Sequence, residues 1–292
     1  MTRRTLPSRA ATAALALVGL ALLAAPSLAS SPRITFVRQD GGDTTSNTHS
    51  RVYTVKPDGS GVFEVTHDGA PVDTYYTAWR PDHTLILFVG RPLETVKPNG
   101  TQRHELPKFK RPSADSPTYR SDGQLIAFTT NNLDGENTHY AIATVKSDGS
   151  GYHRLTKFSI DAQNPTFSPS GKSIAFERGG QIWRMRSDGS QMKKVTHGSC
   201  VARSPDWSSG KSIAYSCNGR ILTVHYGGGG RHTVVKRVQL GGGFADNPAW
   251  SPDDSRIVFD AEGSLYTVKP DGGGLDQITV QTGNRFDERP DW

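Results

Sequence analysis

The chain has 292 residues, of which 31 are glycine and 18 are proline, so about one residue in six bends or breaks regular structure. This composition excludes a helix bundle, because both residue types destabilise helix interiors, and it is typical of many short strands joined by turns. Three of the arginines, Arg3, Arg4 and Arg9, lie in an N-terminal segment that we expect to be removed. The remaining 31 basic residues face 28 acidic ones, and a net charge of +3 is too small to indicate a nucleic-acid partner.

Residues 1–29 are predicted to be a secretory signal peptide. Arg3, Arg4 and Arg9 form a basic start, and residues 10–25 are an unbroken run of Ala, Leu, Val, Thr and Gly. This run of 16 residues is shorter than the roughly 20 that span a membrane, and a cleavage motif of small residues follows it. We expect an exported protein, extracellular or in the periplasm or cell envelope, without stable membrane insertion after signal removal. A retained N-terminal anchor is the alternative.

A Pro-x-aromatic motif recurs through the rest of the chain. Five copies keep the proline, a sixth has lost it, and successive aromatic residues lie 40 to 48 residues apart. The copies are Thr77–Trp79, Pro117–Tyr119, Pro165–Phe167, Pro205–Trp207, Pro248–Trp250 and Pro290–Trp292. This spacing is typical of one four-stranded blade of a β-propeller.

Each repeat also predicts further strands. A short apolar strand is expected over residues 33–36, 85–88, 125–128, 173–176, 212–215 and 256–259. A third strand then ends in a turn signal, such as Asp58-Gly59 or Asp271-Gly272, and both residue types tolerate the positive φ of a tight hairpin. A weaker fourth strand, such as Phe63–Thr66, completes the repeat.

Six such repeats predict one all-β domain over residues 30–292, a six-bladed β-propeller with four-stranded blades. The N-terminal repeat starts at its second strand, and the chain ends in a first strand at Pro290-Asp291-Trp292. We expect the C-terminal strand to join the N-terminal blade and close the ring, because an open ring leaves two strand edges unpaired.

These repeats, which are WD-repeat-like, resemble those of the TolB-like six-bladed propeller family. The family repeat reads approximately Asp-x-x-Pro-x-Trp-Ser-Pro-Asp-Gly, and the copy from Asp246 to Asp253 is nearest to it. The resemblance covers residues 32–292 and implies an exported scaffold that binds other proteins. In the Tol system the propeller follows an N-terminal α/β domain. Here the first blade begins directly after the leader, so we expect a propeller without that domain.

The binding surface is expected on one face of the ring. Turns after the first and third strands are short, whereas loops after second strands include two long ones, residues 39–50 and 130–139. Long loops on a rigid scaffold commonly carry function, so we place binding on their face, around the axial mouth. Candidate residues entering the first strands are Tyr75, Tyr76, Asp115, Asp161, Arg203, Asp246, Asp287 and Glu288. Two interpretations of the acidic ones remain: a collar for a cation or basic peptide, or acceptance of backbone hydrogen bonds in turns.

Cys200 and Cys217 are the only two cysteines of the chain. Cys200 lies just before a predicted first strand, and Cys217 ends the second strand of the same hairpin. In an oxidising compartment we expect them to form a disulfide.

The sequence has no His-Glu-x-x-His, Cys-x-x-Cys, Gly-x-Ser-x-Gly or phosphate-loop motif. We therefore expect no catalytic residue, metal or cofactor, and a monomer that binds a protein or cell-envelope component. The alternative is a carbohydrate-active enzyme, a polysaccharide lyase or glycosidase, with two axial carboxylates about 5 to 10 Å apart. The carboxylates available for such a pair are Asp115, Asp161, Asp246 and Asp287.

Overall fold

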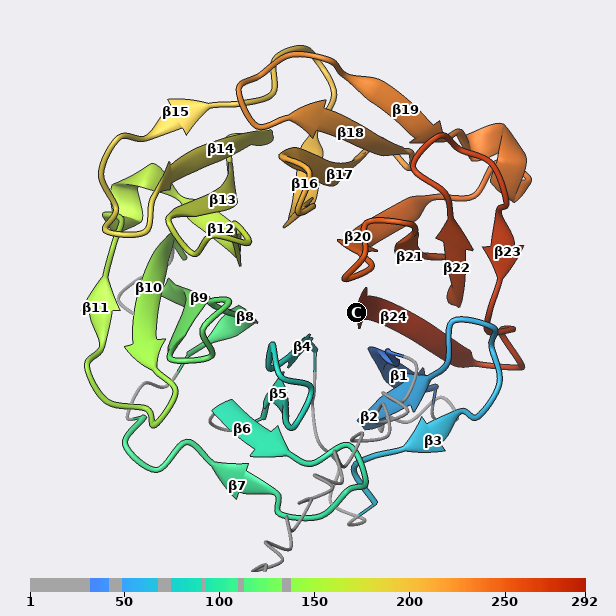
Figure 1. The fold of residues 1–292 in the computed structure, drawn as a ribbon, viewed down its shortest axis with the longest axis horizontal. Helices are drawn as coiled ribbons and strands as arrows, with labels where there is room; N and C mark the ends of the chain where they lie inside the picture. Colours follow the sequence, from blue (N-terminus) through green and yellow to red (C-terminus); the bar gives the residue numbers. More distant parts are fainter. Residues whose placement is uncertain (1–31, 42–48, 68–74, 91–92, 110–112, 133–137) are drawn as a thin grey trace, which may run out of the picture. The chain divides into compact units, whose positions relative to one another are not determined.

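The computed structural model describes residues 32–41, 49–67, 75–90, 93–109, 113–132 and 138–292. The predicted signal peptide and the middle of both long loops lie outside these residues. Six four-stranded antiparallel sheets surround a central axis, which confirms the six-bladed propeller (Figure 1). No helix in the described ranges has the length and apolar character needed to cross a membrane.

The blades follow the chain in order. Blade 1 contains β24 (Arg285–Asp291), β1 (Ile34–Asp40), β2 (His49–Val55) and β3 (Phe63–Glu64). Blade 2 contains β4 (Thr77–Trp79), β5 (Ile86–Val89), β6 (Leu93–Val96) and β7 (His104–Glu105). Blade 3 contains β8 (Asp115–Tyr119), β9 (Leu125–Asn131), β10 (Tyr140–Lys146) and β11 (His153–Arg154).

Blades 4 to 6 have the same order of strands from the axis outward. Blade 4 contains β12 (Ala162–Phe167), β13 (Ser173–Arg178), β14 (Gln181–Arg186) and β15 (Lys193–Lys194). Blade 5 contains β16 (Ala202–Trp207), β17 (Ser212–Cys217), β18 (Ile221–His225) and β19 (His232–Val235). Blade 6 contains β20 (Ala245–Trp250), β21 (Ile257–Ala261), β22 (Ser264–Val268) and β23 (Asp276–Gln277). Two short 3₁₀ turns, η1 (Phe158–Ile160) and η2 (Arg237–Leu240), precede blades 4 and 6.

The C-terminal strand closes the ring as predicted. Strand β24 pairs antiparallel with β1, and Thr35 lies opposite Asp291. A partly buried ion pair fixes this seam, in which Arg38 donates to both carboxylate oxygens of the buried Asp287 over 2.6 and 2.8 Å. The hydrogen bond to Asp287 raises the pKa of Arg38. The two ends of the propeller are therefore joined by backbone pairing and by a charge-assisted contact.

The hydrophobic core lies between neighbouring sheets. The aromatic residue of each second strand is fully buried there, as Phe36, Phe88, Phe128, Phe176, Tyr215 and Phe259 show. Each blade thus contributes a thin apolar layer, which explains how a chain with 34% hydrophobic residues fills its core.

The threonines that follow four of the short fourth strands extend the pairing between the third and fourth strands. Each Thr hydroxyl accepts a hydrogen bond from an amide of the third strand, which continues the sheet where backbone pairing stops. The pairs are Val52 with Thr66, Ile142 with Thr156, Ile182 with Thr196 and Leu265 with Thr279, at 2.9 to 3.1 Å. This contact explains the repeated Val-Thr, Leu-Thr and Ile-Thr pairs of the sequence.

The Asp-Gly turns also join neighbouring blades. Gly59 and Gly272 have φ of 81° and 88°, the left-handed region that glycine enters without strain. A Cβ on Gly272 would lie 2.7 Å from the carbonyl oxygen of Val234 in blade 5, and one on Gly59 would lie 2.6 Å from that of Ile278. Glycine is therefore required both by the turn and by the close approach of the preceding blade.

Candidate functional site

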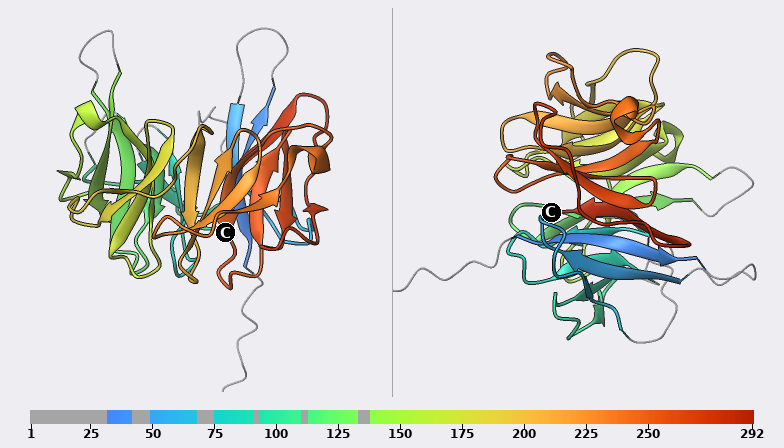
Figure 2. Two further views of the ribbon diagram at one scale, coloured as in Figure 1. Left: turned by 90° about the horizontal axis from the view of Figure 1, so that it is seen from above. Right: turned by 90° about the vertical axis from the view of Figure 1, so that its right-hand side faces the viewer.

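The strands run between two faces of the ring (Figure 2). One face carries the turns between first and second strands and the Asp-Gly hairpins. The other carries the connections between second and third strands and those that enter each first strand; we call it the variable face.

A bulge in the innermost strand shapes the axial mouth on the variable face. The pairing register shifts next to the proline of the repeat in β8, β12, β16, β20 and β24. The residue before each proline has φ between 47° and 53°; these residues are Ser116, Asn164, Ser204, Asn247 and Arg289. A bulge redirects a side chain, and here all five line the axial cavity.

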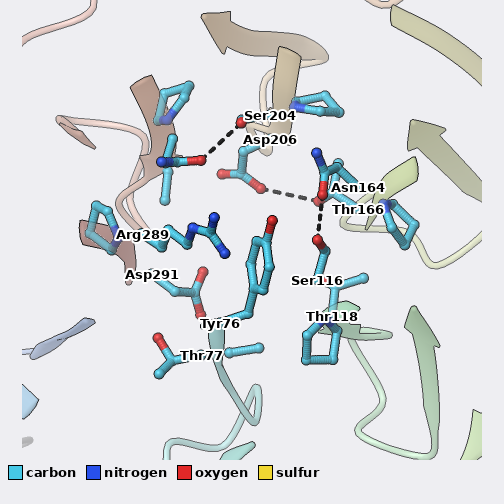
Figure 3. A pocket seen from close by; sticks show the side chains of 18 residues that line it. Tyr76, Thr77, Ser116, Thr118, Asn164, Thr166, Ser204, Asp206, Arg289 and Asp291 are labelled. Carbon is cyan, nitrogen blue, oxygen red and sulfur yellow. Dashed lines mark hydrogen bonds between the residues drawn. The ribbon is translucent and has the colours of Figure 1, made fainter. Parts of the chain in front are cut away.

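This cavity has a volume of about 120 Å³. Five blades contribute the residues on both sides of the repeat proline, and blade 2 contributes Tyr76, Thr77 and Ala78, where Thr77 replaces the proline. Four of the six positions around the mouth are small and polar, whereas Tyr76 and Arg289 are large (Figure 3).

Tyr76 and Arg289 form a stacked pair that points into the cavity (Figure 3). The guanidinium carbon of Arg289 lies 3.8 Å from the centre of the Tyr76 ring, and its Nη1 donates to the carbonyl of Tyr75 over 2.8 Å. Burial raises the pKa of the Tyr76 hydroxyl, so the ring stays neutral. The pair leaves part of the Arg289 fork facing the cavity, where a ligand acceptor can reach it.

Buried carboxylates of the second strands hold the small mouth residues in place. Glu177 Oε1 accepts from the side chain of Asn164 and from the amide of Ser204, both at 2.5 Å. Asp260 Oδ1 accepts from the side chain of Asn247 over 2.8 Å and from the amide of Arg289 over 3.0 Å. Each carboxylate therefore ties two adjacent blades together. Burial raises the pKa of Glu177 and brings that of Asp260 to about 7.

Two further carboxylates, Asp206 and Asp291, directly follow the repeat prolines of blades 5 and 1 and line the same cavity (Figure 3). Asp206 accepts from the amide of Trp250 over 2.7 Å and from the hydroxyl of Thr166 over 3.1 Å, and Asp291 accepts from the amide of Trp79 over 2.7 Å. Burial raises the pKa of Asp206 to about 6 and that of Asp291 to about 7, and the charge of Asp206 adds to the second shift.

Asp206 and Asp291 also line a second cavity, of about 240 Å³. The aromatic residues of all six Pro-x-aromatic motifs surround it, toward the face of the Asp-Gly hairpins. The two carboxylates therefore contribute to the wall of both axial cavities.

Of the eight predicted site residues, only Tyr76 is among the described residues that line the mouth cavity. Tyr76 lines the cavity, and Tyr75 is exposed next to it and supplies the carbonyl that Arg289 binds. Asp115 accepts from the following amide over 2.9 Å, and Asp246 accepts likewise over 2.8 Å. Both aspartates thus accept backbone hydrogen bonds in their bulged first strands, and burial raises the pKa of Asp115.

The remaining four predicted residues also lie outside the described lining of the mouth cavity. Asp161 follows η1 and accepts from the amide of Tyr140 over 3.1 Å, and Arg203 is exposed on β16. Asp287 is occupied by the seam with Arg38, and Glu288 accepts from the side-chain amide of Gln39 over 3.3 Å.

Cys200 and Cys217 are joined by a disulfide, with their Cα atoms 5.7 Å apart. The bond connects the segment entering β16 to the end of β17, on the variable face. In the described part of the chain, no three His, Cys, Asp or Glu side chains come together in a group that could hold a metal ion.

Comparison with known proteins agrees with this architecture. Among solved structures the chain is similar to TolB from Acinetobacter baumannii, with 21% identity, TM-score 0.72, and coverage of 89% of this chain and 66% of that one. It therefore spans just under two thirds of that TolB chain. It is also similar to a putative TolB from Agrobacterium tumefaciens, with 17% identity, TM-score 0.68, and coverage of 88% and 98%.

A third solved structure, described as oligogalacturonate lyase in complex with manganese, has 14% identity and a TM-score of 0.57, covering 78% of this chain and 70% of that one. At these identities the three likenesses show the fold alone. The family model for the TolB beta propeller domain, in contrast, matches residues 26–292. The chain therefore belongs to the TolB beta-propeller domain family.

Proposed function

We propose that this protein is an exported, non-enzymatic propeller scaffold that binds a protein or cell-envelope component through the axial mouth of its variable face. The observation that carries the proposal is the stacked pair of Tyr76 and Arg289 in a ring of otherwise small polar residues. Aromatic and arginine side chains contribute most of the binding energy in many protein interfaces. The cavity is small, so a protruding side chain or chain end enters it while the rest of the partner rests on the rim.

The hydrogen bonding of the mouth supports a scaffold more than a catalyst. Asp115, Glu177, Asp246 and Asp260 all accept hydrogen bonds from amides or side chains of the propeller itself. These bonds hold the bulged residues in fixed positions. A rigid, preorganised rim loses little conformational entropy on binding.

Two features support export. The disulfide between Cys200 and Cys217 is of the kind that persists in oxidising compartments outside the cytoplasm. Family membership agrees with a cell-envelope protein, since the relatives above include TolB proteins.

The test is capture from an envelope fraction with a variant that changes only the mouth. In Tyr76→Ser/Arg289→Asn, both large residues are replaced by types that already occupy the equivalent positions in other blades, as Ser116 and Asn164 do. Asparagine also tolerates the positive φ of Arg289. We expect immobilised wild-type residues 30–292 to capture an envelope component saturably, and the double variant to lose at least about tenfold in affinity, or about 1.4 kcal/mol.

Lys269→Gln on the opposite face is the matched control and should capture as the wild type does. Equal capture by the double variant would remove the mouth from the interface. No saturable capture by the wild type would contradict the scaffold itself.

A carbohydrate-active enzyme is the second candidate, favoured by Asp206 and Asp291. Their raised pKa values, about 6 and about 7, suit a general acid at neutral pH. Of the carboxylates considered from the sequence, Asp287 is occupied by Arg38. Incubation with polygalacturonate and other polysaccharides should give new chain ends with the wild type and none with Asp291→Asn. No product from the wild type contradicts the enzyme, and equal product from both proteins contradicts a catalytic role of Asp291.

A further inference from the structure

We infer that a second site on the variable face, beside the β17–β18 turn, docks a short acidic segment of a partner protein that also carries apolar side chains. The site, which we call the Phe244 patch, consists of Val201, Arg220, Lys236, Arg237, Val238 and Phe244. The inference rests on the proposed function, since it requires a partner on the variable face, but it assigns a site separate from the axial mouth.

Two apolar members of the patch, Val201 and Phe244, flank one turn, and Val238 directly follows Arg237, whose guanidinium lies over the Phe244 ring. The amide of Val201 donates to the side chain of Asn218 over 3.4 Å on one side of this turn. On the other side the ring of Phe244 covers Gly219 so closely that a Cβ there would lie 2.6 Å from it. Residues from three connections thus meet at the rim of blade 5.

The apolar side chains of the patch are largely exposed to solvent. Val238 is 78% exposed, Phe244 57% and Val201 44%. Single exposed apolar residues are common, but a group gathered at one place often marks a binding surface.

The patch contains three cations, and one carboxylate, that of Glu262, lies at its border. The guanidinium of Arg237 lies 4.0 Å from the centre of the Phe244 ring and donates to the carbonyl of Gly242 through Nε and Nη2, over 3.0 and 2.6 Å. Arg220 donates to the carbonyl of Cys217 over 3.3 Å. Within the described chain, neither these two arginines nor Lys236 forms an ion pair. Glu262 borders the patch and accepts from the amide of Phe244 over 3.0 Å.

Internal bonds brace the backbone on both sides of the patch. The disulfide fixes the segment that contains Val201 to the end of β17. In the other connection, the amide of Lys236 donates to Gln239 over 2.7 Å, and the amide of Gly242 donates to the carbonyl of Arg237 over 2.9 Å. A braced surface binds with a small loss of conformational entropy.

The chemistry of the patch specifies the partner. Unpaired cations beside exposed apolar side chains complement a segment that alternates carboxylates with aliphatic or aromatic residues. Three cations around one turn suit a short peptide, whereas recognition of an anionic lipid surface typically takes clusters of about 4 to 8 basic residues.

The test uses residues 30–292 and labelled synthetic peptides of about twelve residues. The first probe repeats Asp-Leu-Glu-Phe, the second replaces both acids with lysine, and the third replaces both apolar residues with serine. Fluorescence anisotropy should show binding of the first probe, at least about tenfold weaker binding of the other two, and weakening as salt rises from about 50 to about 500 mM.

The variants Phe244→Ala, Val238→Asp and Arg237→Glu should each weaken binding of the first probe about tenfold or more. Val238 and Phe244 are exposed, so these replacements leave the core intact, and unchanged melting temperatures check this. The control Lys269→Glu changes an exposed cation on the opposite face and should have no effect.

Equal binding of the acidic and basic probes, or probe binding that none of the three variants changes, overturns the assignment. Sedimentation with phosphatidylglycerol vesicles that depends on Phe244, without peptide binding, overturns it in favour of a lipid surface. Loss of envelope capture in Tyr76→Ser/Arg289→Asn together with no patch-dependent peptide binding leaves the proposed function standing and refutes this inference alone.

Discussion

Individual carboxylates in this propeller hold blades together, and the contribution of each to the free energy of unfolding depends on its partners. Asp287 faces the guanidinium of Arg38 at the seam, whereas Asp206, Asp260 and Asp291 accept hydrogen bonds from neutral amides and hydroxyls. Burial without a cation raises the pKa values of the latter three to between about 6 and 7.

Asp287→Ala should destabilise the protein by about 2 to 3 kcal/mol, because it removes both charge-assisted hydrogen bonds of the partly buried Arg38 guanidinium. The control Asp276→Ala removes an exposed ion pair with Arg256 and should cost less than about 1 kcal/mol. Urea unfolding of both variants measures the difference. Equal effects would mean that the seam does not depend on this pair.

Asp291→Asn should stabilise the protein at pH 8 and much less at pH 5. The folded pKa of Asp291 is about 7, above the unfolded value near 4, so the wild type gains stability as pH falls and loses it as pH rises through 7. Asparagine keeps an acceptor for the amide of Trp79 without the buried charge. Melting temperatures across this pH range should diverge by a few degrees on the alkaline side. Parallel curves would contradict the assigned pKa.

The residues that line the axial mouth could be predicted only in part from the sequence. The sequence pointed to residues such as Asp115 and Asp246, which lie two positions before the proline of the repeat. The cavity is instead lined by the residues directly before and after that proline, including Arg289 and Asp291. The reason is the bulge. The residue directly before the proline has a positive φ, which turns its side chain toward the axis. Tyr76 was found because it lies in that position in blade 2.

Among the structural elements, the Asp-Gly hairpins do more than reverse the chain, because each also contacts the preceding blade. Asp-Gly predicted the tight turns, but the contact of each glycine with the preceding blade depends on blade packing, which a single repeat does not reveal. Likewise, the two residues of β7 have little strand propensity of their own, and pairing with β6 places them in the sheet.

Gly272→Ala should lower stability by about 1 to 3 kcal/mol, since the new Cβ meets the carbonyl of Val234 and the residue has φ of 88°. Gly229→Ala, in another hairpin on the same face, is the control, because no atom lies within 4 Å of its added Cβ. Differential scanning calorimetry of the pair provides the comparison. A control as unstable as Gly272→Ala would show that blade contact is not the cause.

At the scale of the whole molecule, the repeat count and the split first blade were sufficient to predict the number of blades and the closure of the ring. Six Pro-x-aromatic motifs correspond to six sheets, and β24 occupies the place that the N-terminal repeat leaves open. The lining of the axial mouth was harder to predict, because it is composed of short segments from six blades that are far apart in the chain.

Truncation before Glu288 should abolish soluble expression, because it removes most of β24 and leaves β1 and the side of blade 6 without partners. Solubility and a thermal melt of the shortened chain test this. A truncated protein that melts like the full chain would contradict closure by the C-terminal strand.

We propose that a partner binds at the variable face, with its axial mouth. Hydrogen–deuterium exchange of residues 30–292, with and without the captured envelope component, is the measurement that decides this. We predict slower exchange in peptides that contain Tyr76, Ser116 and Arg289, and unchanged exchange in the Asp-Gly hairpins at Gly59 and Gly272. Protection confined to the hairpins, or spread equally over both faces, would contradict it.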